Sequence, residues 1–371
     1  MSFKTQIQKN LSNVPGWRTN QKLLVIESDD WGSLRMPSLN TFNSLEMQGL
    51  DFSSGDAARY NLNDTLASAQ DLEALYGVLC KFIDRNGKHP VFTPVSLVAN
   101  PDFEKIKSSD FQEYFYEPFT TTLKRYNHEN AFLLWQQGIQ EQLFIPQFHG
   151  REHLNVAVWM RALQANDREA RLAFEKECWG FHNKHRLGIA YQSAFDLEHI
   201  TDLRNQENSI KEGLQLFEEI FGYKARFFVP PNGPFNNYLE GVAADAGIRY
   251  MSASKMQLES LGEGKRRKVL HWLGQKNKYG QRYITRNCFF EPSMQGPDWI
   301  SDCLQDILTA FRWGKPAIIS SHRVNYIGGL NEKNRTNGLL QLHLLLENIV
   351  KKWPDVEFMS SDKLGDLINT A

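Results

Sequence analysis

Residues 22–32 read Lys22-Leu-Leu-Val-Ile-Glu-Ser-Asp29-Asp30-Trp-Gly32, an apolar and β-branched run that ends in two adjacent carboxylates. Such a run, bounded by polar and turn residues, predicts a buried strand over Lys22–Ile26. In α/β folds, ligands and catalytic groups gather where the strands end. Adjacent strand residues point to opposite faces, so Asp29 and Asp30 can serve one site only if the backbone turns there. The alternative is that one of them merely caps a turn or a helix.

Similar apolar runs recur along the chain, and helical periodicities separate them. Further strands are expected at Val91–Leu97, Leu143–Phe148, Ala225–Val229, Arg249–Ser252, Pro316–Ser320 and Val356–Met359. Helices are expected at about Ala67–Arg85, Asp167–His185, Leu203–Phe221, Asn236–Ala246, Trp299–Phe311 and Leu339–Val350. This alternation predicts an α/β fold with a mainly parallel sheet, either open or closed into a barrel.

The length of 371 residues fits either two or three domains of ordinary size or one large barrel with insertions. Hydrophobic residues make up 41% of the chain, enough for a sizeable core and too many for a disordered protein. No repeat or Pro/Gly/Ser-rich linker marks a domain boundary. We therefore expect a single domain over residues 1–371, with insertions near 37–63, 102–141, 155–195 and 256–294, where neither periodicity holds.

Charge and cysteine content restrict the partners. Lys and Arg total 42 against 43 for Asp and Glu, without the basic excess that nucleic acid binding demands. No stretch has the roughly 18 apolar residues of a membrane span, and the first twenty residues lack the apolar core of a signal peptide. Four cysteines without CxxC spacing do not form a disulfide scaffold. We expect a cytoplasmic protein without nucleic acid or membrane partners; the sequence does not indicate its oligomeric state.

A second constellation, His149-Gly-Arg-Glu152-His153, directly follows an expected strand. Two imidazoles four residues apart can share one metal ion on a helical face or at a strand-to-helix corner. The rival interpretation is the HxxEH pattern of a metallopeptidase, with Glu152 as general base. Gly150 and the β-like run containing Pro146 fit poorly with the helix that this pattern needs.

Two more strand ends carry candidate residues. Phe228-Val229-Pro230-Pro231-Asn232-Gly233 forms a rigid turn whose backbone amides could face a substrate. Ser320-Ser321-His322 places an imidazole, suited to proton transfer near neutral pH, just past a buried strand. An ordinary loop and a capping histidine are the alternatives.

Together, and in this order, these four motifs resemble those of the polysaccharide deacetylase family, also called the NodB-homology family or carbohydrate esterase family 4. The resemblance implies a distorted TIM-like barrel of seven or eight strands and removal of acyl groups with a divalent metal, usually zinc. It implies Asp29 as catalytic base, His322 as general acid, and three metal ligands, Asp30, His149 and His153. Pro231, Asn232 and Gly233 correspond to the family's substrate loop, of which a backbone N–H would hold the oxyanion.

Two departures from the family pattern stand out. Val229 occupies the usual place of an arginine that orients the catalytic aspartate, for which Arg226, Arg151 or Arg323 could substitute. No counterpart is evident for the aspartate that tunes the acid histidine. The leading hypothesis is a metal-dependent hydrolase that removes an acetyl group from an N-acetylated sugar or polysaccharide, or from another acylated small molecule. A barrel that binds metal or sugar without catalysis is the alternative, followed by the HxxEH metallopeptidase.

Overall fold

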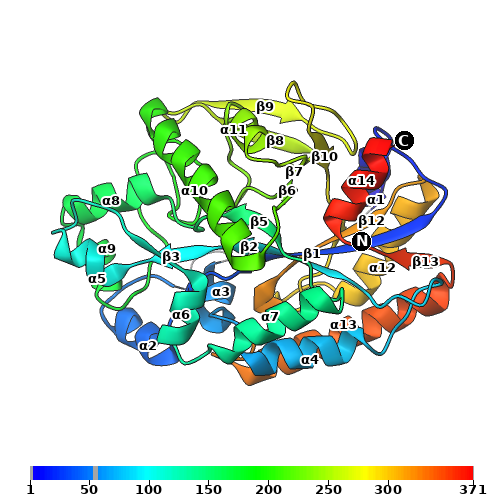
Figure 1. Cartoon of the computed structure of the whole chain (residues 1–371), viewed down its shortest axis with the longest axis horizontal. Helices are drawn as coiled ribbons and strands as arrows, with labels where there is room; N and C mark the ends of the chain where they lie inside the picture. Colours follow the sequence, from blue (N-terminus) through cyan, green and yellow to red (C-terminus); the bar gives the residue numbers. More distant parts are fainter. Residues whose placement is uncertain (1–2, 53–56, 371) are drawn as a thin grey trace.

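The computed structural model describes residues 3–52 and 57–370. Its centre is a parallel sheet that follows the order β10-β7-β6-β5-β2-β1-β12-β11, with β13 added beside the start of β1 (Figure 1). The strands of this sheet are β1 (Lys22–Trp31), β2 (Phe92–Leu97), β5 (Gln147–Gly150), β6 (Phe227–Phe228), β7 (Tyr250–Ser252), β10 (Arg282–Ile284), β11 (Cys288–Phe289), β12 (Ala317–His322) and β13 (Val356–Phe358). Two antiparallel pairs lie outside it: β3 (Ala99–Pro101) with β4 (Tyr116–Pro118), and β8 (Met256–Ser260) with β9 (Arg266–Leu270).

The sheet curls, and the late strand β12 lies beside the first strand, β1. β12 pairs with β1 from Leu24↔Ala317 to Asp29↔His322, which brings the carboxyl ends of both strands together. β10 and β11 belong to one extended run without an intervening turn; its first half pairs with β7 and its second half with β12. One run therefore borders both ends of the curled sheet, and the predicted α/β, distorted TIM-like barrel is confirmed.

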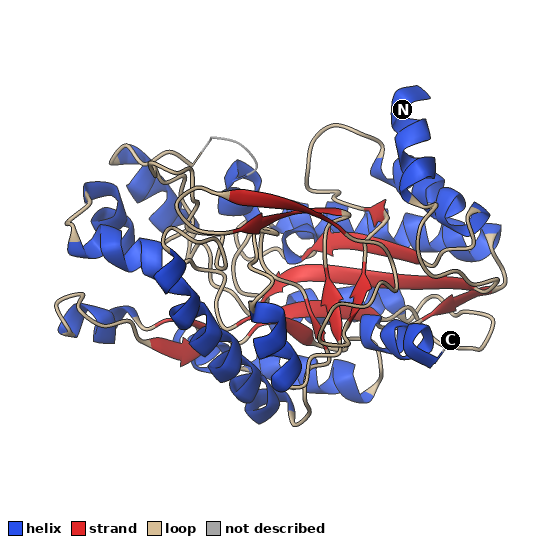
Figure 2. Cartoon of the chain, turned by 90° about the horizontal axis from the view of Figure 1, so that it is seen from above, coloured by secondary structure: helices blue, strands red, loops and turns tan. Residues whose placement is uncertain are grey.

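Helices surround the sheet (Figures 1 and 2). They are α1 (Phe3–Ser12), α2 (Leu39–Met47), α3 (Ala57–Asn63), α4 (Ala69–Leu79), α5 (Phe103–Ser108), α6 (Phe119–Arg125), α7 (Asn130–Gln140), α8 (Val156–Gln164), α9 (Arg168–Phe174), α10 (Leu203–Phe221), α11 (Leu239–Asp245), α12 (Trp299–Arg312), α13 (Glu332–Lys352) and α14 (Ser361–Thr370). Successive residues of β1 alternate between two apolar clusters: Leu24 and Ile26 pack with the outer helices, and Leu23 and Val25 with α14.

Most expected elements form, with shifted ends. The predicted helix Leu203–Phe221 matches α10 residue for residue, and its end is fixed by Gly222 at a φ of 77°. The helix expected over Asp167–His185 is wrong beyond Phe174, because Glu177 adopts a φ of 54° and the chain continues in turns. The helix expected from Ala67 begins instead after a capping box that joins Ser68 to Asp71.

Three of the four segments expected as insertions pack together outside the central sheet, and the fourth contributes strands to it. Parts of 37–63, 102–141 and 155–195 share a second apolar cluster, which includes Met36, Phe103, Trp159 and Trp179. Residues 53–56 of the first segment, like residues 1, 2 and 371 of the expected single domain, lie outside the described residues. Segment 256–294, in contrast, contributes β10 and β11 to the central sheet, so treating all of it as an insertion was wrong. β10 and β11 have only three and two residues, too few to give a periodic pattern.

The N-terminal segment is tied to the sheet by a buried lysine. Lys315, just before β12, donates hydrogen bonds from Nζ to the carbonyl oxygens of Pro15, Gly16 and Trp17 at 2.6–2.8 Å. Trp17 N also donates to Leu273 O. The four cysteines are free thiols. No helix within the described ranges 3–52 and 57–370 is long and apolar enough to cross a membrane.

Candidate active site

The two aspartates at the end of β1 occupy a backbone irregularity. The pairing of β1 with β2 shifts register between Ser28 and Trp31, and Asp30 has a φ of 74°. This local bulge breaks the alternation of side chains, so both Asp29 and Asp30 border the same cavity. The turn that the sequence analysis required for a shared site is therefore present.

Gly32 makes this path of the chain possible. Its φ is 87°, and a Cβ atom placed on it would lie 2.2 Å from the carbonyl oxygen of Leu97 on the neighbouring strand. A side chain at this position would be strained by the backbone and by the contact alike. The glycine thus lets the loop after the aspartates pass close to β2.

The two histidines leave β5 in a similar way. Gly150 separates them with a φ of 144°, a conformation that favours glycine, and the pairing of β2 with β5 shifts register beside it. His149 Nδ1 lies 2.6 Å from the carbonyl oxygen of Val229. That contact fixes the proton on Nδ1 and leaves Nε2 free to act as a ligand. The His153 ring stacks on Trp179 at 6.3 Å between centroids.

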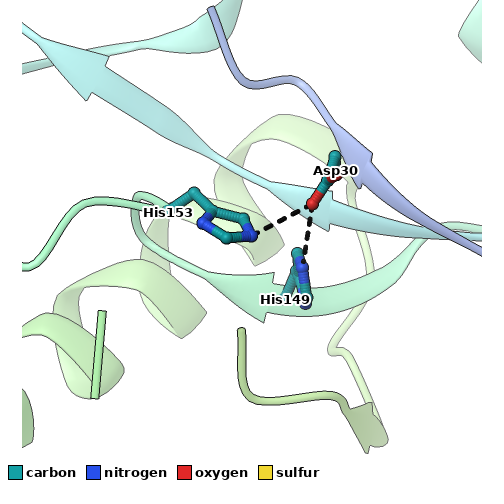
Figure 3. Close-up of side chains that lie close together, drawn as sticks. All are labelled: Asp30, His149 and His153. Atoms are coloured by element: carbon teal, nitrogen blue, oxygen red, sulfur yellow. Dashed lines mark ion pairs between the residues drawn. The ribbon is translucent and has the colours of Figure 1, made fainter. Parts of the chain in front are cut away.

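Asp30, His149 and His153 form a buried cluster (Figure 3). Asp30 Oδ1 lies 3.4 Å from His149 Nε2 and 3.1 Å from His153 Nε2. Two donors that each bind a tetrahedral zinc ion at about 2.0–2.1 Å are about 3.3 Å apart, so these separations suit a shared ion. Burial lowers the pKa of His153, which favours the neutral imidazole that metal binding needs. The three side chains therefore fit a divalent metal.

The charge of Asp30 also suits this use. Burial by itself raises the pKa of its carboxyl group, but the neighbouring imidazoles, above all His153, and the Arg35 guanidinium outweigh that effect and hold the pKa well below its ordinary value. Asp30 is therefore ionised at neutral pH. One carboxylate and two imidazoles leave further coordination positions open, as in catalytic rather than structural metal sites.

Arg286 holds the neighbouring Asp29. It donates two hydrogen bonds to this carboxylate, at 2.5 and 2.6 Å, and a third, at 2.6 Å, to the buried Glu27. Burial raises the pKa of Asp29, but the guanidinium outweighs it, so the pKa is lowered. Arg286 lies in the run between β10 and β11, where the chain changes its neighbouring strand.

The arginines that the sequence offered for this role have other partners. Arg226 pairs with Asp362 and Asp366. Arg151 pairs with Glu152 and Glu212, and Arg323 with Asp64. None of these three arginines forms an ion pair with Asp29, because each already pairs with other carboxylates. Arg286 therefore makes the contact with Asp29 that the resemblance implied for an arginine at position 229.

His322 is paired with a glutamate. Its Nδ1 lies 2.5 Å from Glu291 Oε1, while its Nε2 faces Asp29 Oδ2 at 3.8 Å. Glu291 Oε2 accepts hydrogen bonds from Arg59 and Asn325, both at 2.9 Å. Burial lowers the pKa of His322, but the Glu291 carboxylate outweighs it and raises the pKa to about 9. The imidazole is therefore protonated at neutral pH.

These groups border one cavity of about 770 Å³, within the usual range for small-molecule sites. Asp29, Asp30 and the three histidines of the predicted site all line it. Of the predicted substrate loop, Asn232 and Gly233 line the cavity, whereas Pro231 does not and has no N–H to donate. Pro230 takes the place of Pro231 in the wall.

The HxxEH alternative does not fit this geometry. His149 belongs to a strand and His153 to the bends that follow it, so no helix carries both residues. Glu152 pairs with Arg151 and accepts a hydrogen bond from Ser209 at 3.1 Å, outside the main cavity. It therefore cannot act as a base beside the histidines.

Sequence reasoning missed Arg286 and Glu291. Both lie in segment 256–294, where the short runs Tyr283-Ile284 and Cys288-Phe289-Phe290 are β-like but brief. Glu291 follows the second run directly, which is the same signal of a polar residue at a strand end that indicated His322. Arg286 carries no comparable signal, because its partners are more than 250 positions away along the chain.

No protein-family model matches the chain. No curated protein matches it in sequence.

Several solved structures resemble the chain at low identity. A probable polysaccharide deacetylase from Pseudomonas aeruginosa PAO1 shares 9% identity over 94% of this chain and 91% of its own, with a TM-score of 0.48. PuuE allantoinase has 10% identity, the same coverages and a TM-score of 0.47. The Xyl-CE4 domain of a multidomain xylanase from the hindgut metagenome of Trinervitermes trinervoides has 10% identity, the same coverages and a TM-score of 0.39. Polysaccharide deacetylases and a CE4 domain are thus among the structures that the chain resembles, at a similarity too low to assign it an activity.

Proposed function

We propose that the protein is a metal-dependent hydrolase that removes an acetyl group from an N-acetylated sugar or polysaccharide. One observation carries this proposal: three potential metal ligands, an ionised aspartate and a protonated histidine border the same cavity. Hydrolysis of an acyl amide needs an activated water, a base and an acid for the departing amine, and this set can supply all three.

Asp30, His149 and His153 would hold the metal. The imidazole and carboxylate donors suit Zn²⁺. A divalent ion bound there would lower the pKa of a water molecule and polarise the acyl carbonyl. The Val229 carbonyl orients one of its imidazoles through Nδ1. The Trp179 ring orients the other by stacking.

Asp29 would take the proton of the attacking water at a carboxylate oxygen. Its lowered pKa keeps the carboxylate ionised and ready to accept a proton at neutral pH. Arg286 is a positioning residue, because its bidentate contact fixes the plane of the carboxylate. The backbone N–H groups of Asn232 and Gly233 would stabilise the negative charge that develops on the acyl oxygen.

His322 would donate a proton from Nε2 to the departing amine. Its raised pKa of about 9 leaves it charged below that pH. Glu291 holds Nδ1–H and thereby aims Nε2 toward the side of the cavity that Asp29 faces. The base and the acid are thus held by separate charged partners, Arg286 and Glu291.

The test is release of acetate from N-acetylated and O-acetylated sugars and oligosaccharides by the purified, metal-loaded protein. Asp29→Asn should retain stoichiometric metal and lose turnover, since the amide is a poor base with nearly the same shape. Full activity of that variant would remove Asp29 from the mechanism. Absence of acetate release from every substrate by the metal-loaded wild-type protein would refute the proposed function.

A binding barrel without catalysis is less well supported. It was motivated by the missing arginine at Val229 and by the missing acidic partner of His322. Arg286 supplies a cation to Asp29, and Glu291 supplies a carboxylate to His322.

The cytoplasmic location expected from cysteine usage stays a prediction.

A further inference from the structure

Arg35 is a buried arginine that forms no ion pair with the described residues. Four arginine side chains are buried among the described residues, and Arg35 is 6% exposed. The other three each form ion pairs with carboxylates: Arg151 with Glu152, Arg323 with Asp64 and Arg335 with Asp71. In the described part of the chain Arg35 has no ion pair, and its side chain donates no hydrogen bond to the protein. The Asp30 carboxylate acts on this charge through space but accepts no hydrogen bond from it, so the N–H donors of Arg35 are left for a ligand in the cavity.

The guanidinium is held in place by its faces rather than by its edges. Its central carbon lies 4.3 Å from the ring centroid of Tyr60 and 6.0 Å from that of Trp179. Gly180 gives its stem room, because a Cβ there would come within 2.7 Å of Arg35 Cγ. Aromatic contacts of this kind leave the in-plane N–H donors of arginine unused. The side chain is therefore fixed before any ligand arrives.

The position of Arg35 points to a ligand of the main cavity. Arg35 lines that cavity together with Asp30 and His153, and Trp179 packs against both Arg35 and His153. The other arginine of the cavity wall, Arg286, is occupied by Glu27, Asp29 and Ser320. Arg35 thus offers a free planar donor set beside the cluster that is proposed to hold the metal.

We propose that Arg35 binds an anionic group of the substrate, a carboxylate, phosphate or sulfate, so that the acylated sugar processed in this cavity is an acidic one. The substrate class rests on the proposed function; the anion contact does not. A planar guanidinium with parallel N–H donors matches the oxygen pairs of all three groups, and a charge-assisted contact of this kind is strong where water is excluded. Arg35 is accordingly a specificity-determining residue for the same cavity.

The experiment measures binding rather than turnover. The metal-loaded full-length protein is titrated in a calorimeter with N-acetylglucosamine, its 6-phosphate, its 6-sulfate and N-acetylmuramic acid. At least one anionic probe should bind about 10-fold or more tightly than the neutral sugar, since a hydrogen bond to a charged group is worth that factor. The preferred probe identifies which anion the site takes, and the preference should weaken in high salt.

Two variants locate the contact. Arg35→Met should reduce the anion preference to within about 2-fold, and Arg35→Lys should retain part of it because the charge remains. Lys255→Met is the matched control, since Lys255 is another cavity-lining cation without an ion pair among the described residues and donates only to Ser12 Oγ at 3.0 Å. Thermal unfolding of each variant checks that it is folded.

Three outcomes overturn the proposal: no anion preference in the wild type, no binding of any anionic probe, or a preference that survives Arg35→Met. Should Arg35→Met fail to fold, Arg35→Lys decides: its anion preference should lie below that of the wild type, and an unchanged preference overturns the proposal. The outcome for the proposed function is separate. Acetate release from a neutral sugar supports it even without anion preference, and anion binding through Arg35 stands even if no acetate is released.

Discussion

Replacement of Arg286 by methionine tests whether this arginine holds the proposed base Asp29 and the buried Glu27 in place. The side chain is 14% exposed, and its carboxylate partners Glu27 and Asp29 are 0% and 8% exposed. Removing one member of a buried, hydrogen-bonded charge set destabilises a protein by roughly 3–5 kcal/mol, because the remaining charge is left buried and unpaired. Here two carboxylates lose their common partner, so we expect a loss in this range at pH 7.

The loss should depend on pH in a definite direction. In the wild type the pKa of Asp29 is lowered from 3.8, so its contribution to stability is present above that value and is lost as the pH falls through the folded-state pKa. In Arg286→Met the pKa values of Asp29 and Glu27 rise, and protonated carboxyls need no cation. The difference in free energy of unfolding between variant and wild type should therefore shrink as the pH is lowered.

Urea denaturation followed by circular dichroism at pH 7 and at lower pH measures this difference. Arg226→Met is the matched control: Arg226 also binds two carboxylates, but it is 27% exposed and remote from Asp29. We expect it to cost less than Arg286→Met, because Arg226 and Asp366 are partly exposed, and to leave acetate release unchanged. Arg286→Met should reduce kcat/KM about 100-fold, the usual effect of a misplaced catalytic group. Wild-type stability of Arg286→Met at pH 7 would refute the reasoning.

Three further predictions follow from the same geometry. His149→Ala should lose stoichiometric metal, measured by plasma mass spectrometry, whereas His185→Ala should keep it; metal retained by the first variant would contradict the ligand assignment. The raised pKa of His322 means that activity falls, and that the stabilising pair with Glu291 is lost, as the pH rises through about 9. Glu291→Gln should move this fall to lower pH, which pH–rate profiles and NMR titration of the imidazole can detect. Gly32→Ala should destabilise the protein by at least about 2 kcal/mol in thermal or urea unfolding, and wild-type stability would exclude the close contact described for this glycine.

The sequence revealed the long elements and the strand ends that carry the site. β1, β2 and β12 are runs of six to ten residues, long enough to show an apolar pattern, and their last residues include Asp29, Asp30 and His322. Their convergence follows from parallel pairing, since Asp29 and His322 are register partners. The local rule of polar residues after an apolar strand was therefore sufficient for these side chains.

The remainder of the site depends on contacts that no local pattern records. Arg286 meets Glu27 and Asp29 only because the sheet curls until its last run reaches β12. The run around it is too short to be identified as a strand from periodicity. Arg35 lies in a bend after β1, and its lack of an ion pair becomes visible only when every neighbouring chain segment is in place.

The attachment of the N-terminal segment affects how the protein can be shortened. Lys9, Ser12 and Asn13 line the same cavity as the catalytic candidates, and Lys315 fastens the following residues through three carbonyl oxygens. A chain begun at Lys22 would keep every strand of the sheet and every proposed metal ligand. It would nevertheless lose Lys9, Ser12 and Asn13 from the wall of the cavity, and the Lys315 ammonium would lose its three carbonyl acceptors. Residues 9–17 should therefore be kept in any shortened version of the protein, although they precede the first strand of the sheet.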